Sequence, residues 1–155
     1  MSFVCVLDMD ETLGYFDGST FQIRPKLMFL LQFLYMKEIK IVLWSMGEDE
    51  YVMRICNGFL QKISLYADVI FGRKECKVSE RKYGFCKASE HIRTLYTEPI
   101  ILIAVDDKVN QNMDDMYDLR IYVKPYKKVD SNDLELTNVV EKITSFWIEQ
   151  MCPNW

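Results

Sequence analysis

The sequence has little of what marks membrane proteins, secreted proteins and zinc scaffolds. No apolar run approaches the roughly 20 residues that a bilayer-spanning helix needs. The first residues show no basic stretch ahead of an apolar one, so no signal peptide is expected. One histidine and five cysteines without a Cys-x-x-Cys pair match neither a closed zinc site nor a disulfide framework. We expect free thiols in a reducing intracellular compartment, either cytoplasmic or nuclear.

Glycine and proline are also scarce, with 6 and 4 copies, and no linker, repeat or low-complexity segment is present. A single domain over residues 1–155 is therefore predicted. The 23 acidic residues exceed the 19 basic ones and give a net charge of -4, which argues against direct binding of nucleic acid. Membrane association is not expected either, and no sequence feature indicates an oligomeric state.

Short apolar runs alternate with amphipathic stretches of helical period along the chain. The runs predict about five strands, and the stretches predict helices between them. A loop with Gly14, Gly18 and Ser19 is expected after the first strand. Such alternation is typical of an α/β fold with a mostly parallel sheet covered on both faces. The expected strands are 3–7, 39–44, 68–71, 100–105 and 119–123, and the expected helices begin near 25, 48, 88 and 131–133.

Polar side chains follow three of these strands. Asp8 and Asp10 come after the first strand, Ser45 after the second, and Asp106-Asp107 after the fourth. Because parallel strands end at the same edge of a sheet, these groups are expected to converge. Solvated acids or a helix cap would explain one such group, but two acidic pairs at one edge repel each other. A divalent cation relieves that repulsion, and oxygen ligands favour Mg²⁺ over Zn²⁺.

These residues carry a family resemblance that runs from about residue 3 to residue 126. The stretch Asp8-Met9-Asp10-Glu11-Thr12-Leu13 resembles the Asp-x-Asp-x-Thr motif of the haloacid-dehalogenase (HAD) phosphatases. It is close to the form found in FCP/SCP-type phosphatases, which act on the C-terminal domain (CTD) of RNA polymerase II. Three further stretches are similar to later motifs of that family. They are Trp44-Ser45-Met46-Gly47, Val105-Asp106-Asp107 and Val123-Lys124-Pro125-Tyr126.

The resemblance implies a HAD-like Rossmannoid three-layer fold without a large cap domain, and it assigns roles to the strand-end residues. Asp8 would be the nucleophile, and Asp10 would be the general acid and base. Thr12 would orient Asp10 or tighten the loop, and Thr12 and Ser45 are counted with a lysine as phosphate-binding residues. Ser45 could equally cap the helix that follows it.

Mg²⁺ would be held by Asp8, by the backbone carbonyl of Asp10 and by the acidic pair, with Asp107 as the direct ligand. Asp106 would then bind a metal-bound water or the lysine.

The lysine of the third motif is harder to identify. Residues 72–93 contain seven basic side chains against three glutamates, an excess that suits a phosphate but also suits a solvated surface. Lys87 is favoured because it precedes an expected helix start, while Lys82 and Lys77 remain alternatives. A small insert, of β type, is expected around residues 72–86, too short to close over a substrate.

An uncapped site admits a large substrate. The resemblance therefore implies an Mg²⁺-dependent phosphomonoester hydrolase that acts on phosphoserine or phosphothreonine in a protein or peptide, through an aspartyl-phosphate. The polymerase CTD is one such substrate. Two other functions stay open, a catalytically weak phosphopeptide- or polymerase-binding module and a small-molecule HAD phosphatase. A response-regulator receiver domain fits poorly, since the third strand ends in Phe71-Gly72 without an aspartate.

Overall fold

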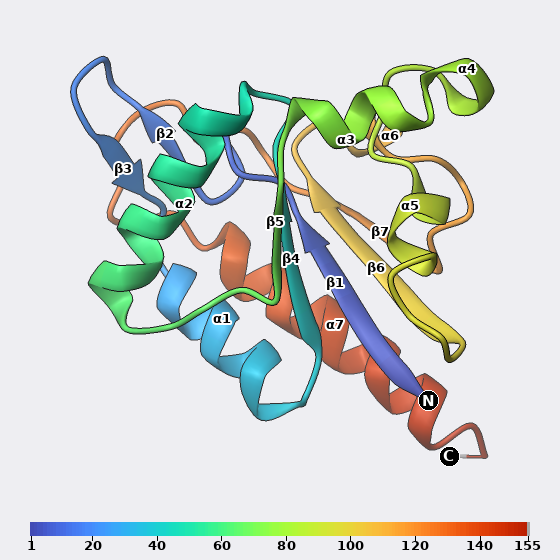
Figure 1. The fold of residues 1–155 in the computed structure, drawn as a ribbon. Coiled ribbons are helices and arrows are strands. Elements are labelled where there is room, and N and C mark those ends of the chain that lie inside the picture. The colour runs from blue at the N-terminus through green and yellow to red at the C-terminus, as the bar shows by residue number, and fades with distance from the viewer. Residues whose placement is uncertain (155) are drawn as a thin grey trace.

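The computed structural model describes residues 1–154, which form a central five-stranded sheet in the order β5-β4-β1-β6-β7 (Figure 1). Every neighbouring pair in this sheet is parallel. The α/β class and the sheet of about five strands are thus confirmed. The strands are β1 (Ser2–Leu7), β4 (Lys40–Trp44), β5 (Val69–Phe71), β6 (Ile100–Asp106) and β7 (Leu119–Tyr122).

Helices cover both faces of the sheet, because successive residues of a strand point to opposite sides. In β1, Phe3, Cys5 and Leu7 belong to the core under one helical layer, and Val4 and Val6 belong to the core under the other. This arrangement is the expected three-layer fold. The first layer contains α1 (Leu27–Met36), α2 (Asp49–Ile63) and α7 (Glu135–Met151), and the second contains α3 (Arg73–Val78), α5 (Ser89–Arg93) and α6 (Val109–Asn112).

The segment after the first strand is not only a loop, as the sequence suggested. It forms an antiparallel hairpin of β2 (Gly14–Phe16) and β3 (Phe21–Ile23). Asp17 closes the turn, because its Oδ1 accepts hydrogen bonds from the backbone N–H groups of Ser19 and Thr20. A Cβ atom at Gly14 would collide with the carbonyl oxygen of Gln22 and the ring of Phe21, so glycine is required for this pairing.

The expected β insert around residues 72–86 is helical instead, and that prediction was wrong. It folds into α3 and α4 (Glu80–Tyr83), which lie beyond the carboxyl edge of the sheet (Figure 1). Charged residues dominate this segment and Cys76 is the buried residue of α3, so no alternating apolar pattern supports a strand. Residues 1–154 contain no separate cap domain, and the single-domain division remains a prediction.

The last helix begins later than expected, at Glu135 rather than at residues 131–133. Asp133 still accepts the backbone N–H of Glu135 through Oδ1, at 3.2 Å. Both of its carboxylate oxygens also accept hydrogen bonds from the guanidinium of Arg24, at 2.8 and 3.0 Å. Arg24 is buried and also donates to the backbone carbonyls of Glu11 and Thr12, at 3.2 Å each. This ion pair therefore ties the loop after β1 to the start of α7.

The cysteines are free thiols, as expected, and four of the five are buried. None of the helices within residues 1–154 combines the length and apolar character that a bilayer-spanning segment needs.

Candidate active site

Three carboxylates meet where β1 and β6 end. These strands are adjacent and parallel, and the backbone N–H of Asp8 extends their pairing by donating to the carbonyl of Val105 at 2.9 Å. Asp8, Asp106 and Asp107 each bring one oxygen to within 4.8 Å of the others, and all three are buried. The structure thus brings together three of the acids that the sequence placed at one edge.

Lys87 supplies the positive charge in this cluster. Its ammonium donates to Asp8 Oδ1 and to Asp106 Oδ2, at 2.7 Å each, and its side chain is fully buried. Burial works to lower the pKa of Lys87, but the two carboxylates outweigh it and hold that pKa above its usual value. The two alternatives lie elsewhere, since Lys82 is exposed and pairs with Glu90 while Lys77 is exposed on α3.

The two acids at the end of β6 have different environments. Asp106 accepts hydrogen bonds from Lys87, from the backbone N–H of Lys108 and from the carboxamide of Asn112. Burial raises the pKa of Asp106, but the charge of Lys87 and these bonds bring it below its usual value. Asp107 receives no such compensation from Lys87. Burial and the nearby charges of Asp8 and Asp106 raise its pKa to about 8.

This imbalance suits a divalent cation. Three buried carboxylates face one lysine, and burial also raises the pKa of Asp8 despite the opposing charge of Lys87. A cation beside Asp8 and Asp107 would offset the excess negative charge. The cluster offers carboxylate oxygens and neither imidazole nor thiolate, a donor set typical of Mg²⁺ and unlike a zinc site.

Thr12 contacts Asp8 and Asp107 and not Asp10, so of the two roles that the resemblance implied, tightening the loop fits the structure and orienting Asp10 does not. Its buried hydroxyl donates to Asp8 Oδ2 at 2.7 Å and accepts a hydrogen bond from the backbone N–H of Asp107 at 3.1 Å. The loop that carries Thr12 turns sharply, and Glu11 adopts a left-handed conformation with φ of 66°. Thr12 therefore holds the nucleophile candidate and the acidic pair in place, and a contact with phosphate stays a prediction.

Asp10 lies beside this cluster and is partly open to solvent. Its carboxylate accepts a hydrogen bond from the hydroxyl of Tyr51 at 3.2 Å, and Ser45 Oγ lies 3.5 Å from its other oxygen. Ser45 Oγ also accepts a hydrogen bond from the N–H of Gly47 at 3.0 Å, so it helps to shape the loop before α2. Burial and the charge of Asp8 raise the pKa of Asp10 above its usual value.

Three residues of this region were missed by the sequence analysis. Tyr51 lies in the first turn of α2, next to charged residues that indicate a helix start and not a catalytic site. Asn112 and Arg24 reach the site from segments without a recognisable motif. An arginine followed by a proline is a weak signal, and helix α1 begins only at Leu27. The burial of Arg24 and its bond to the carbonyl of Glu11 show that it fixes the loop after β1.

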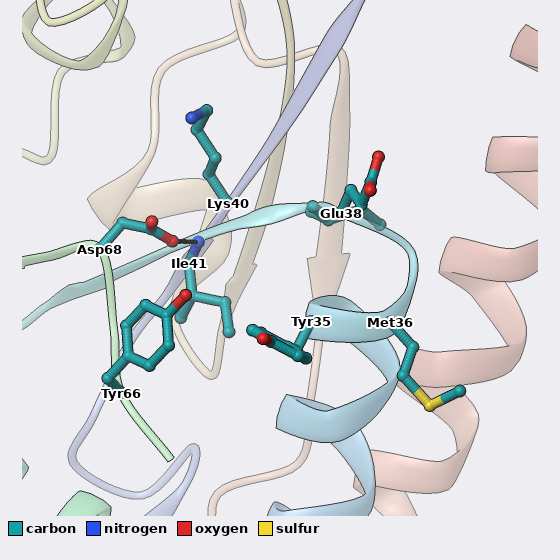
Figure 2. A pocket seen from close by; sticks show the side chains of 8 residues that line it. Tyr35, Met36, Glu38, Lys40, Ile41, Tyr66 and Asp68 are labelled. Atoms are coloured by element: carbon teal, nitrogen blue, oxygen red, sulfur yellow. Dashed lines mark hydrogen bonds between the residues drawn. The ribbon is translucent and has the colours of Figure 1, made fainter.

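A hollow of about 400 Å³ lies at the other end of β4, away from the carboxylates (Figure 2). Tyr35 and Tyr66 meet there edge to face with ring centroids 6.0 Å apart. The carboxylate of Asp68, the residue before β5, accepts a hydrogen bond from the backbone N–H of Ile41 in β4 at 2.8 Å. None of the clustered acids lines this hollow.

Comparison with known proteins identifies the family of the chain. A family model described as NLI interacting factor-like phosphatase matches residues 3–150. Two solved structures of Fcp1 share the fold, each with a TM-score of 0.56. One is the fission yeast RNA polymerase II CTD phosphatase Fcp1 bound to beryllium fluoride, at 14% identity, and the other is described as an essential RNA polymerase II CTD phosphatase, at 15%. No curated protein matches the chain.

Both structural matches cover 96% of this chain but only 51% and 50% of the Fcp1 chains, so the chain spans about half their length. At this identity they establish the fold alone. The family match extends over nearly all of the chain and includes every strand-end acid described above. The resemblance seen in the sequence is thereby confirmed, and the chain belongs to the NLI interacting factor-like phosphatases, the FCP/SCP family of HAD-type, CTD-phosphatase-like proteins.

Proposed function

We propose that this chain is an Mg²⁺-dependent phosphatase of phosphoserine or phosphothreonine in proteins, working through an aspartyl-phosphate on Asp8. One observation carries the proposal. The carboxylate of Asp8 is held through both oxygens, by Lys87 on one side and by Thr12 on the other, with Asp10 close by. Such an orientation suits a nucleophile that must approach phosphorus along one line.

In the first step, a carboxylate oxygen of Asp8 attacks phosphorus while the bond to the seryl or threonyl oxygen breaks. Asp10 gives its proton to that leaving oxygen, and its raised pKa favours the protonated form that this step needs. The buried ammonium of Lys87 stabilises negative charge on the phosphoryl oxygens. Ser45 Oγ, which lies 3.5 Å from a carboxylate oxygen of Asp10, would donate a hydrogen bond to one of the phosphoryl oxygens.

In the second step, Asp10 has become a carboxylate and accepts a proton from a water molecule. The water oxygen attacks phosphorus, the bond to Asp8 breaks and inorganic phosphate leaves. Asp10 is again protonated and Asp8 again a carboxylate, so the cycle closes without another reactant. Tyr51 donates a hydrogen bond to Asp10 and keeps this carboxyl group pointing toward the site.

Asp8, Asp107 and the backbone carbonyl of Asp10 would hold Mg²⁺, with Asp106 turned toward Lys87. When bound, the ion shields the phosphate from the carboxylate that attacks it and neutralises charge that develops on the phosphoryl oxygens.

Millimolar Mg²⁺ is expected to stabilise the fold, because it neutralises buried carboxylates that repel one another. At one hundred times the dissociation constant, the free energy of unfolding rises by about 2.7 kcal/mol. Differential scanning fluorimetry with NaCl at matched ionic strength measures this shift. Asp107→Asn should lose most of the shift, whereas Asp115→Asn, at an exposed position, should keep it. Equal melting temperatures with and without Mg²⁺ would contradict the assignment of these ligands.

A phosphoprotein substrate is favoured over a small phosphate ester. No separate cap closes over the site within residues 1–154, and Asp10 remains partly accessible. An open site of this kind admits a peptide loop or tail, and the phosphorylated CTD of RNA polymerase II is the proposed example. A reducing cytoplasmic or nuclear location suits such a substrate and the free thiols.

The test is hydrolysis, with and without Mg²⁺, of an aryl phosphate and of CTD heptapeptides that carry phosphoserine. We expect Mg²⁺-dependent turnover of both, with a higher kcat/KM for the peptide. Preference for sugar phosphates would indicate a small-molecule phosphatase. Binding of the phosphopeptide without turnover would indicate a binding module and contradict the proposed activity.

A further inference from the structure

Asn112 contacts both members of the buried ion pair at the site. It ends the short helix α6, six residues after Asp106. Its side-chain Nδ2 lies 3.2 Å from Asp106 Oδ1 and 3.1 Å from Asp106 Oδ2. Its backbone carbonyl accepts a hydrogen bond from the backbone N–H of Lys87 at 2.8 Å. One residue therefore holds the side chain of the acid and the main chain of the lysine.

The main chain around Lys87 is fixed by the segment that follows Asn112. The hydroxyl of Tyr117, which is buried, donates to the carbonyl of Lys87 at 2.7 Å. The carboxylate of Asp114 accepts bonds from both the N–H and the hydroxyl of Ser89, at 2.7 Å each. With its backbone held on both sides, Lys87 can vary only in the direction of its side chain.

That direction depends on Asp106. The terminal torsion of an aspartate has a broad, two-fold energy profile, so hydrogen bonds decide where its oxygens point. Lys108 N–H binds one oxygen and Lys87 the other, and the carboxamide of Asn112 bridges the two. Without the carboxamide, Asp106 loses the donor that bridges its two oxygens, and only Lys108 N–H and Lys87 itself still hold it. The carboxylate can then turn further, and the position of the ammonium between Asp106 and Asp8 becomes less well defined.

We propose that Asn112 is a positioning residue that sets the phosphate-binding ammonium of Lys87 through Asp106. The inference rests on the proposed function and deepens it, since it concerns the same site. The side chain suits this task because an amide donates without adding charge, whereas a carboxylate here would repel Asp106. An apolar side chain would leave Asp106 short of one donor.

The kinetic test compares Asn112→Ala with Asn110→Ala, the same change at an exposed position of the same helix. For an aryl phosphate, kcat of Asn112→Ala should fall about 10- to 100-fold. The inhibition constant for inorganic phosphate should rise, because the ammonium that binds phosphate is displaced. The Mg²⁺ dissociation constant should not rise, since Asp8 and Asp107 are untouched and displacement of the ammonium leaves more negative charge beside them. Asn112→Gln, which keeps an amide donor, should recover part of kcat, and Asn110→Ala should match the wild type.

A second readout does not depend on activity. The ammonium of Lys87 is buried and ion-paired, so its ¹H–¹⁵N signal should exchange slowly with water, and Lys87→Met assigns it by its loss. Asn112→Ala should shift and broaden this signal, and Asn110→Ala should leave it unchanged. The same spectra show whether each variant is folded.

The outcomes separate this proposal from the proposed function. If the wild type is active and Asn112→Ala retains its kcat, the proposal is overturned, because any movement of the ammonium that the NMR signal reports then has no effect on the bound phosphate. A raised Mg²⁺ dissociation constant with an unchanged phosphate inhibition constant would also overturn the proposal, because Asn112 would then serve the metal ligands. If the wild type is inactive but Asn112→Ala alters the Lys87 signal, the phosphatase proposal fails and the positioning of Lys87 by Asn112 stands. An inactive wild type with an unaltered signal overturns both.

Discussion

Replacing Asp8 with Asn should abolish phosphatase activity while leaving the protein folded. An amide oxygen is a poor nucleophile, so the aspartyl-phosphate cannot form, and a loss of about 10⁴-fold or more in kcat is expected. The fold should tolerate the change, because Asp8 is buried and its pKa is already raised by burial. Lys87 keeps Asp106 as its partner. Steady-state kinetics and thermal denaturation of the same preparation measure the two effects.

Asp115→Asn is the matched control, since it makes the same chemical change at an exposed position outside the cluster. It should leave both kcat and the melting temperature unchanged. Full activity in Asp8→Asn would show that phosphorus is attacked by another group. Loss of activity together with unfolding would point to a structural function for Asp8 instead.

Replacing Lys87 with Met should reduce both stability and activity. The substitution keeps a side chain of similar length but leaves buried acids without their cation. Breaking a buried ion pair from one side typically costs about 3–5 kcal/mol. Separately, kcat should fall by about 10²- to 10³-fold, because one donor to the phosphoryl oxygens is lost. Chemical denaturation and kinetics with an aryl phosphate measure these changes.

Mg²⁺ should stabilise Lys87→Met more than it stabilises the wild type, because more uncompensated negative charge surrounds the metal site. Lys82→Met is the matched control: this lysine is exposed, pairs with Glu90 at 3.2 Å and was the alternative third-motif residue. Exposed ion pairs contribute little to stability, so Lys82→Met should be close to the wild type in both stability and kcat. A larger loss of activity in Lys82→Met than in Lys87→Met would reverse the assignment of the two lysines.

Much of the site was predictable because strand direction determines it. Asp8, Ser45 and Asp106 each follow an apolar run, and in a parallel sheet such positions share one edge whatever their distance in sequence. Lys87 was predictable as the residue before a helix start, although it lies 79 residues from Asp8. These predictions therefore rested on short sequence patterns that fix where a residue lies in the fold.

The errors arose where a side chain joins segments without a periodic pattern. The ion pair of Arg24 and Asp133 spans 109 residues, and no local pattern indicates it, although Asp133 also accepts the backbone N–H of Glu135 at the start of α7. The hairpin after β1 has strands of only three residues, too short for a period to emerge. For Thr12 the resemblance left two roles open, orienting Asp10 or tightening the loop. The sequence could not decide between them, because the direction of its hydroxyl depends on the loop conformation around Glu11.

The central claim is that Asp8 carries the phosphoryl group during turnover. The most direct measurement is acid quenching of the enzyme during turnover of an aryl phosphate with Mg²⁺, followed by peptide mass spectrometry. Asp10→Asn should be included, because without its general base the covalent intermediate should break down slowly and accumulate. We expect one hydroxylamine-sensitive phosphoryl group on the peptide that contains Asp8, and none in Asp8→Asn. If turnover proceeds and phosphorylated Asp8 is found in neither the wild type nor Asp10→Asn, the mechanism is contradicted.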